Sequence, residues 1–190
     1  MNGVGTKSIE TKRLLLRKMA PADVLNIYDG WTSDPNVSRF TSWDVHENVE
    51  VTNKYVHHKI ARYDMDNYCF DWIVTLKSTG ELIGEIEAVD LSLRDRIIIV
   101  GYCYSSKHWN KGYATEALKA FIDYMFINVD ADKILACHVD LNPASGKVMK
   151  KAGMTLDGIL RGHKVDKVTG ERCDLIWYSI DNPNRGEQNG

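Results

Sequence analysis

Apolar residues recur every three or four positions in the segment that follows Gly112, and this spacing predicts an amphipathic helix. Charged residues lie between them, so one face of the helix is expected to pack on a core and the other to meet water. The apolar positions are Ala114, Ala117, Leu118, Phe121, Ile122 and Met125, and the charged ones are Glu116, Lys119 and Asp123.

The period of the pattern changes to two upstream of this helix, which is typical of strands. Trp72, Val74 and Leu76 alternate with their neighbours, and short polar turns separate this run from the two that follow it. We therefore expect three consecutive strands in an antiparallel meander. They cover 71–76, 82–91 and 96–104.

The remaining periodic segments complete the order β-α-α-β-β-β-α-β-α-β-β along the chain. This order predicts a mixed α/β fold of the α+β kind, in which helices flank a central and mostly antiparallel sheet. Strands are expected at Ile9–Arg17, Lys133–Val139, Thr155–Arg161 and Glu171–Ile180, and helices at Pro21–Trp31, Asn48–Tyr63 and Ala144–Ala152.

The length of 190 residues and the hydrophobic content of 44% are typical of one globular domain with a substantial core. We expect a single domain over 9–180, a disordered stretch over 1–8 and a polar tail over 181–190. No apolar run reaches the ~20 residues that span a bilayer. Residues 1–8 carry no hydrophobic signal core. These features favour a cytoplasmic protein without a membrane partner.

Charge and cysteine usage exclude two further classes of function. A net charge of −2 and a pI of about 6.3 argue against nucleic-acid binding, which usually accompanies a basic excess. Cys69, Cys103, Cys137 and Cys173 are isolated from one another and lie in strand-like runs. Because their spacing lacks the pairs that hold zinc, we expect free buried thiols and no metal site.

The segment from Trp109 to Ala117 joins the third strand of the meander to the amphipathic helix. At such a junction the backbone N–H groups turn outward and the helix dipole adds positive charge, so a phosphate or pyrophosphate fits there. Gly112 and Ala114 keep side chains out of the way of such a ligand. The alternative is a strand–turn–helix connection that binds nothing, because short glycine motifs are unspecific.

Four parts of the chain, in this order, resemble the GNAT (Gcn5-related N-acetyltransferase) superfamily. Within it they are similar to the branch of the RimJ/RimL-type ribosomal-protein alanine N-acetyltransferases. The resemblance covers about Ile9 to Ile180 and depends on their joint occurrence. The parts are Thr11–Arg17, Gly101–Tyr102 with Trp109–Ala117, Asn142–Ser145, and Lys150–Met154 with Asp157–Gly158.

The resemblance implies acetyl-CoA as the acetyl donor. It also implies that the pantetheine arm pairs with the strand that ends at Tyr102, Cys103 and Tyr104. The pyrophosphate would bind N–H groups of the following loop, where Lys107 or Lys111 could add charge. The implied contacts in the loop are Trp109, Asn110, Lys111, Gly112, Tyr113, Ala114 and Thr115.

The resemblance places Ser145 near the thioester sulfur, as proton donor to the departing thiolate. Its alternative is a first-turn serine that bonds only to the backbone. A tyrosine acid that many relatives carry four positions before the glycine is excluded, because that position is Met149. Asn142 has two roles open to it, a contact with the cofactor or the N-cap of a helix.

Glu85 and Glu87 are the candidates for the general base, because alternation places both side chains on one face of their strand. If that face lines the acceptor cleft, burial and like charge would raise one pKa toward neutrality. The alternative is a solvated strand face. His138 has a suitable ordinary pKa, although a histidine at the edge of the core fits equally well.

These observations indicate an acetyl-CoA-dependent N-acetyltransferase acting on a primary amine, such as a protein N-terminal amine. Two alternatives stay open: the same chemistry on a small amine such as a polyamine or aminoglycoside, and a non-catalytic sensor of acyl-CoA. Whether the protein forms a homodimer is also open. Acidic residues near the expected cleft suit a cationic acceptor, and these are Glu47, Glu50, Asp64, Asp66, Glu85, Glu87 and Asp90.

Overall fold

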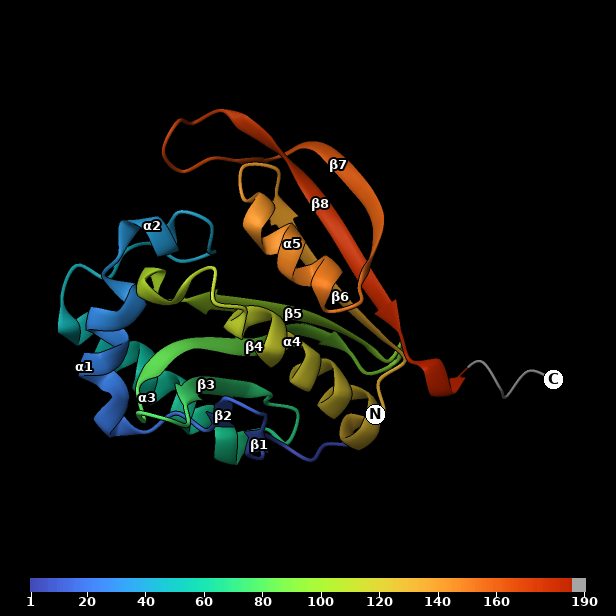
Figure 1. The fold of residues 1–190 in the computed structure, drawn as a ribbon, viewed down its shortest axis with the longest axis horizontal. Coiled ribbons are helices and arrows are strands. Elements are labelled where there is room, and N and C mark those ends of the chain that lie inside the picture. The colour runs from blue at the N-terminus through green and yellow to red at the C-terminus, as the bar shows by residue number, and fades with distance from the viewer. Residues whose placement is uncertain (186–190) are drawn as a thin grey trace.

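The computed structural model of the protein describes residues 1–185, which are built around one eight-stranded sheet (Figure 1). The strands are β1 (Ile9–Glu10), β2 (Leu14–Arg17), β3 (Asp71–Leu76), β4 (Leu82–Ser92), β5 (Ile97–Tyr104), β6 (Lys133–Val139), β7 (Thr155–Val165) and β8 (Arg172–Asp181). The helices are α1 (Val24–Ile27), α2 (Pro35–Ser38), α3 (Val49–Met65), α4 (Tyr113–Tyr124) and α5 (Pro143–Lys151).

The sheet has the strand order β1-β2-β3-β4-β5-β6-β8-β7. Every neighbouring pair is antiparallel except β5 and β6, which are parallel because α4 crosses over between them. The expected mixed and mostly antiparallel sheet with a central meander is therefore confirmed.

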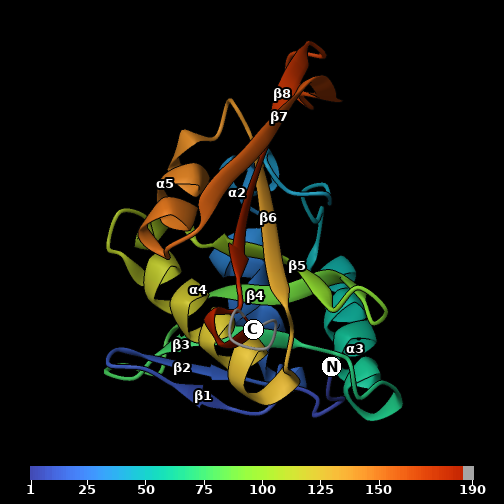
Figure 2. The same cartoon turned by 90° about the vertical axis from the view of Figure 1, so that its right-hand side faces the viewer.

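Strands β5 and β6 pair over only part of their length. Their register runs from Ile97 opposite Lys133 to Ile99 opposite Leu135, and both strands continue well beyond it. Figures 1 and 2 show β6, β8 and β7 leaning away from β5 after this short contact. The sheet is consequently split in the middle, and among the described residues one backbone edge of β5 has no strand partner from Val100 onward; the Tyr104 carbonyl there accepts from the Trp109 Nε1 at 2.7 Å.

Helices cover the two faces of the sheet (Figure 2). The apolar stripe of α4 packs on one face, where the Phe121 ring meets Trp72 edge-on with centroids 5.8 Å apart. Helices α1 and α3 cover the other face, where Ile27, Val56 and Ile73 are buried. The stripe predicted for α4 is confirmed, since its residues from Ala117 to Met125 are buried.

The N-terminal part of the chain differs from the expectation in two ways. Ile9–Arg17 is two strands, because the chain turns back between Glu10 and Leu14 and pairs β1 with β2. Residues 1–8, expected to be disordered, pack against the body of the protein: the Thr6 hydroxyl is buried and donates to the Cys69 carbonyl at 2.8 Å.

Other boundaries also shift. A short helix that was not expected, α2, follows the first predicted helix, and the Asp34 side chain caps it by accepting from the Asn36 N–H. Strand β7 extends to Val165 and lengthens the final hairpin. Asn182, at the start of the expected tail, is buried and donates to the Ala131 carbonyl at 2.8 Å, while 186–190 lie outside the described residues.

In the part of the chain that the structure describes, none of the helices has the length and apolar character to cross a membrane.

Candidate active site

The split between β5 and β6 opens into a cleft with a cavity volume of about 760 Å³. Glu85 and Cys103 lie opposite each other on β4 and β5 and face the α3 side of the sheet. Tyr102 and Tyr104, which alternate with Cys103, face the α4 side. Because residues from both faces line the cleft, it passes through the sheet and gives two ligands access to one point.

The N-terminus of α4 forms one end of the cleft. Gly112 precedes the helix with φ of 78°, and Asn110 has φ of 61°, so the loop turns in left-handed conformations that glycine and asparagine tolerate. Among the described residues no side chain caps this helix. The first N–H groups of α4 are therefore available to an anion.

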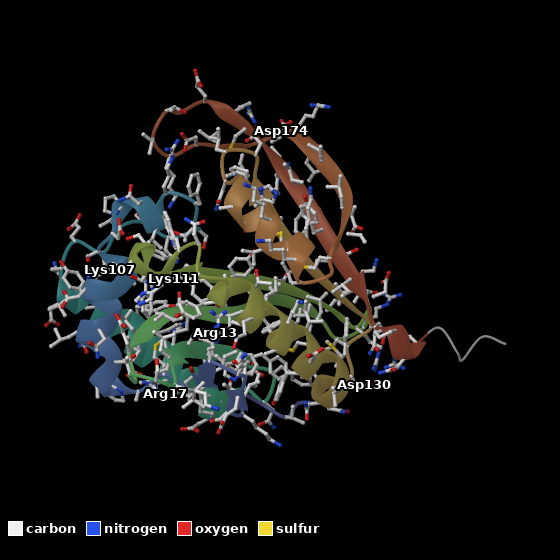
Figure 3. The ribbon with its side chains drawn as sticks, viewed as in Figure 1. Arg13, Arg17, Lys107, Lys111, Asp130 and Asp174 are labelled. Carbon is white, nitrogen blue, oxygen red and sulfur yellow. The ribbon has the colours of Figure 1, made fainter. Side chains whose placement is uncertain are left out.

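Arg13, which is labelled in Figure 3, and Glu116 hold this loop in place. Glu116, in the first turn of α4, accepts from the Arg13 Nε at 2.6 Å, the Arg13 N–H at 2.9 Å and the Thr11 hydroxyl at 2.6 Å. The Arg13 guanidinium also donates to the Lys111 carbonyl at 3.0 Å and lies 4.5 Å from the centre of the Tyr113 ring. These contacts, which sequence reasoning missed, fix the loop from the side of β2.

The cleft is lined by all but one of the residues for which a cofactor contact was expected: Tyr102, Cys103, Tyr104, Trp109, Asn110, Gly112, Tyr113, Ala114, Thr115 and Asn142. Lys111 is outside the lining, and so is Lys107; the Lys111 backbone binds Arg13 instead. The lysines that do line the cleft are Lys147 and Lys151 on α5. Their helical spacing places both on one face.

Helix α5 begins at Asn142, whose side chain accepts from the Ser145 N–H at 3.4 Å. Asn142 is therefore an N-cap that also borders the cleft. The Ser145 hydroxyl lies 2.9 Å from the Tyr102 hydroxyl on β5. Burial raises the pKa of Tyr102, so its hydroxyl keeps its proton. A tyrosine thus stands beside Ser145, although from a strand and not from the helical position of Met149.

Glu85 and Glu87 both line the cleft on the α3 side. Of the two possibilities that the sequence left open, a face that lines the cleft and a solvated strand face, the structure shows the first. Glu85 is buried, and desolvation, with the charges of Glu87 and Asp71, raises its pKa to about 7 against the pull of Lys59. The Tyr55 hydroxyl donates to its Oε2 at 2.8 Å. The other acidic residues expected near the cleft are outside its lining.

A buried cation accompanies these carboxylates. Lys59 on α3 donates to Glu87 and lies 2.7 Å from Asp71 Oδ2, and its side chain is only 6% exposed. Sequence reasoning missed Lys59 and Asp71, because their pairing joins a helix to a strand.

His138 lies at the edge of the core, where it is buried and lines the cleft. Its ring stacks on Tyr178 with centroids 5.7 Å apart, and its Nδ1 is 2.8 Å from the Val139 carbonyl. Its Nε2 faces Gly146 so closely that a Cβ there would come within 2.5 Å of it. This packing favours a histidine at the edge of the core over a general base.

Residues 40–43 after α2 form another part of the cleft lining. The turn between β7 and β8 fixes this segment: Asp166 pairs with Arg39 at 3.1 Å, and Lys167 donates to the Trp43 carbonyl at 2.6 Å. The final hairpin therefore holds one wall of the cleft.

The four cysteines are free thiols, although Cys69 precedes β3 and is outside any strand. Over residues 1–185, no cluster of three or more His, Cys, Asp or Glu side chains is arranged to hold a metal ion.

Comparisons with known proteins agree with this geometry. Residues 13–155 match the family model of the acetyltransferase (GNAT) domain. An uncharacterized N-acetyltransferase of Bacillus subtilis (strain 168), YoaA, is 28% identical over 175 residues, covering 92% of this chain and 97% of that protein. A second one from the same organism, YnaD, is 31% identical over 172 residues, covering 90% and 95%.

Solved structures share the fold. A GNAT-family acetyltransferase from Bacillus anthracis has a TM-score of 0.81 at 26% identity, over 93% of this chain and 99% of that one. RimL, a ribosomal L7/L12 alpha-N-protein acetyltransferase solved with coenzyme A, has a TM-score of 0.81 at 17% identity, over 92% and 98%. The fold and the family that the sequence indicated are confirmed. The chain belongs to the GNAT acetyltransferase family and is an acyltransferase of the kind that uses acetyl-CoA.

Proposed function

We propose that this protein transfers the acetyl group of acetyl-CoA to a primary α-amine, with donor and acceptor meeting in the split of the sheet. The observation that carries the proposal is the cleft itself. It joins an uncapped helix N-terminus on one side of the sheet to a buried carboxylate on the other.

The donor end fits acetyl-CoA in three respects. The N-terminus of α4 offers N–H groups to a pyrophosphate, and Lys147 and Lys151 add positive charge. Apart from the Tyr104 carbonyl, which Trp109 occupies, the edge of β5 from Val100 to Tyr104 offers backbone groups with which an extended amide-containing arm can pair as a strand does. Supplied there, acetyl-CoA brings an activated thioester to the acceptor.

Glu85 is the base in this proposal. With a pKa of about 7 it is largely ionised at slightly alkaline pH and can take a proton from an incoming ammonium group. An α-ammonium group has a pKa of about 7.7–8.0, whereas a lysine side chain has about 10.4. Each unit of mismatch costs about 1.4 kcal/mol. The proton affinity of Glu85 therefore favours an α-amine over a lysine or polyamine.

The thiolate of CoA, which leaves when the acetyl group is transferred, also needs a proton. Ser145 and Tyr102 form a pair of hydroxyls there, and the raised pKa of Tyr102 keeps a proton available to Ser145. The pair can therefore donate to the sulfur through Ser145, with Tyr102 restoring the proton.

Thiol release from acetyl-CoA tests the proposed function. A lysine-free peptide with an open N-terminus should support turnover, while the same peptide with a blocked N-terminus and one added lysine should not. Turnover with spermidine but with neither peptide would overturn the α-amine assignment. Binding of acetyl-CoA without thiol release for any amine would overturn the transferase assignment in favour of a sensor.

Ser145→Ala should lower kcat by about 10²-fold, at the lower end of the range for a proton donor, because the thiolate would leave unprotonated. The KM for acetyl-CoA should stay near its wild-type value, since the Ser145 N–H and the Asn142 cap remain. Steady-state kinetics would separate the two parameters. Ser92→Ala, at the last residue of β4, serves as the control. An unchanged kcat in Ser145→Ala would remove Ser145 from the reaction.

Arg13→Met should raise the KM for acetyl-CoA about tenfold and leave kcat unchanged, because the α4 loop loses charge-assisted contacts worth about 1.5–3 kcal/mol. Arg17→Met is the matched control: it lies at the other end of β2 and pairs with Asp23 at 2.7 Å, away from the loop (Figure 3). Equal changes in KM for the two variants would show that Arg13 acts on general stability alone.

A further inference from the structure

Four charged groups meet under the acceptor end of the cleft: Lys59 on α3, Asp71 on β3, and Glu85 and Glu87 on β4. Asp71 and Glu87 are directly opposite each other in the β3–β4 ladder. Two like charges at such positions repel each other. The Lys59 ammonium contacts both carboxylates, so one cation holds a cross-strand pair of anions together.

Three of these four groups are buried, and the fourth, Glu87, has a side chain that is 23% exposed. The side chains of Asp71 and Lys59 are 2% and 6% exposed, and Glu85 is likewise buried. Within residues 1–185 no hydrogen-bond donor reaches Asp71 Oδ1, which leaves the Lys59 ammonium as its compensation. Buried ion pairs seldom stabilise a fold more than apolar residues of the same volume would. Stability alone therefore gives little reason for the cluster.

Within this cluster, Lys59 and the proposed base Glu85 share a neighbour, Tyr55. Tyr55, one helical turn before Lys59, donates to Glu85 Oε2, and the Lys59 ammonium lies 5.3 Å from the centre of its ring. The groups that face Glu85 from every packed element are Tyr55 and Lys59 of α3, Asp71 of β3, Glu87 of β4 and Cys103 of β5. Lys59 is the one cation among them.

We propose that Lys59 and Asp71 are positioning residues that act electrostatically on the base Glu85 from the α3 side of the sheet. The cation of Lys59 favours ionised Glu85, whereas the anion of Asp71 opposes it and draws on the same cation. This inference rests on the proposed role of Glu85. It assigns to the two residues a tuning role that requires no contact with either substrate.

Lys59 lowers the pKa of Glu85 and Asp71 raises it, so substitutions at the two positions should have opposite effects. Lys59→Met removes the attraction, so the acidic limb of the kcat/KM profile should move to higher pH by about one unit or more. Asp71→Asn removes a repulsion and frees the ammonium for Glu85, so the limb should move to lower pH. Lys77→Met, which breaks an exposed pair with Glu10, should leave it in place.

Folding is checked by thermal melting, and Lys59→Arg keeps the charge and should retain the wild-type limb. A ¹³C NMR titration of the Glu85 carboxyl, assigned against Glu85→Gln, reads the same quantity without turnover. The inference would be overturned if Lys59→Met and Asp71→Asn both fold and their acidic limbs either stay in place or both move in the same direction. If Glu85→Gln keeps full activity, the base assignment fails as well, so the two failures are distinguishable.

Discussion

Glu85→Gln is expected to lower kcat by about 10²–10⁴-fold, the usual contribution of a positioned general base. Glutamine keeps the shape of the side chain and can still accept from Tyr55, but it cannot take a proton from the amine. The residual rate should rise with pH as the amine loses its proton to water. In the wild type, kcat/KM should fall about tenfold per pH unit below pH 7, because Glu85 is then protonated.

The stability of the same variant separates loss of chemistry from loss of fold. The pKa of Glu85 is about 7 in the folded protein and about 4.3 in the unfolded chain, so the folded state binds more protons between these values. Stability contributed by this carboxyl is therefore lost as the pH rises through that window. Above pH 7 its ionisation costs up to about 4 kcal/mol, which Glu85→Gln avoids.

Thermal melting at pH 8 should accordingly show Glu85→Gln to be at least as stable as the wild type. Glu10→Gln, at an exposed position of β1, should change neither kcat nor the melting temperature appreciably. A Glu85→Gln protein that melts normally and turns over at the wild-type rate would contradict the base assignment and return Glu87 to consideration.

The elements that the sequence predicted well are those with a strong local period. The stripe of α4 reflects one buried face, and burial follows from pattern when neighbours in sequence share it. The alternation around Trp72 placed β3 correctly, although all six residues of this strand are buried because helices cover both faces of the sheet. Strand β6 was predicted with its observed ends for the same reason. The division of Ile9–Arg17 was missed, because a turn of three polar residues leaves little trace in a short apolar run.

The site was predictable where it is made by contiguous residues. The turn at Gly112 and the cap at Asn142 are local features, so the chain positions them without tertiary information. The split beyond Ile99 depends on how far β6 follows β5, which no local pattern encodes. The burial of Lys59 is likewise invisible, since an α-helical lysine is ordinarily exposed and its partners come from separate strands.

Gly112→Val should raise the dissociation constant of acetyl-CoA about 10²-fold or more. A valine at φ of 78° is strained by about 1–2 kcal/mol, and relief of the strain would turn the loop N–H groups away from the ligand. Each hydrogen bond to a charged phosphate is worth about 1.5–3 kcal/mol, so losing two accounts for the change. Calorimetric titration with acetyl-CoA and CoA, with ATP for comparison, measures it.

Gly80→Val is the matched control for this experiment. Gly80 has φ of 75° in the turn between β3 and β4, and a Cβ there meets open space. It should suffer the same backbone strain and a similar fall in melting temperature, yet bind acetyl-CoA with wild-type affinity. Equal binding by the two variants would mean that the α4 N-terminus is not the pyrophosphate site. Because both variants carry the same backbone strain, a difference in their affinity for acetyl-CoA is due to the position of Gly112 at the N-terminus of α4 and not to strain in general.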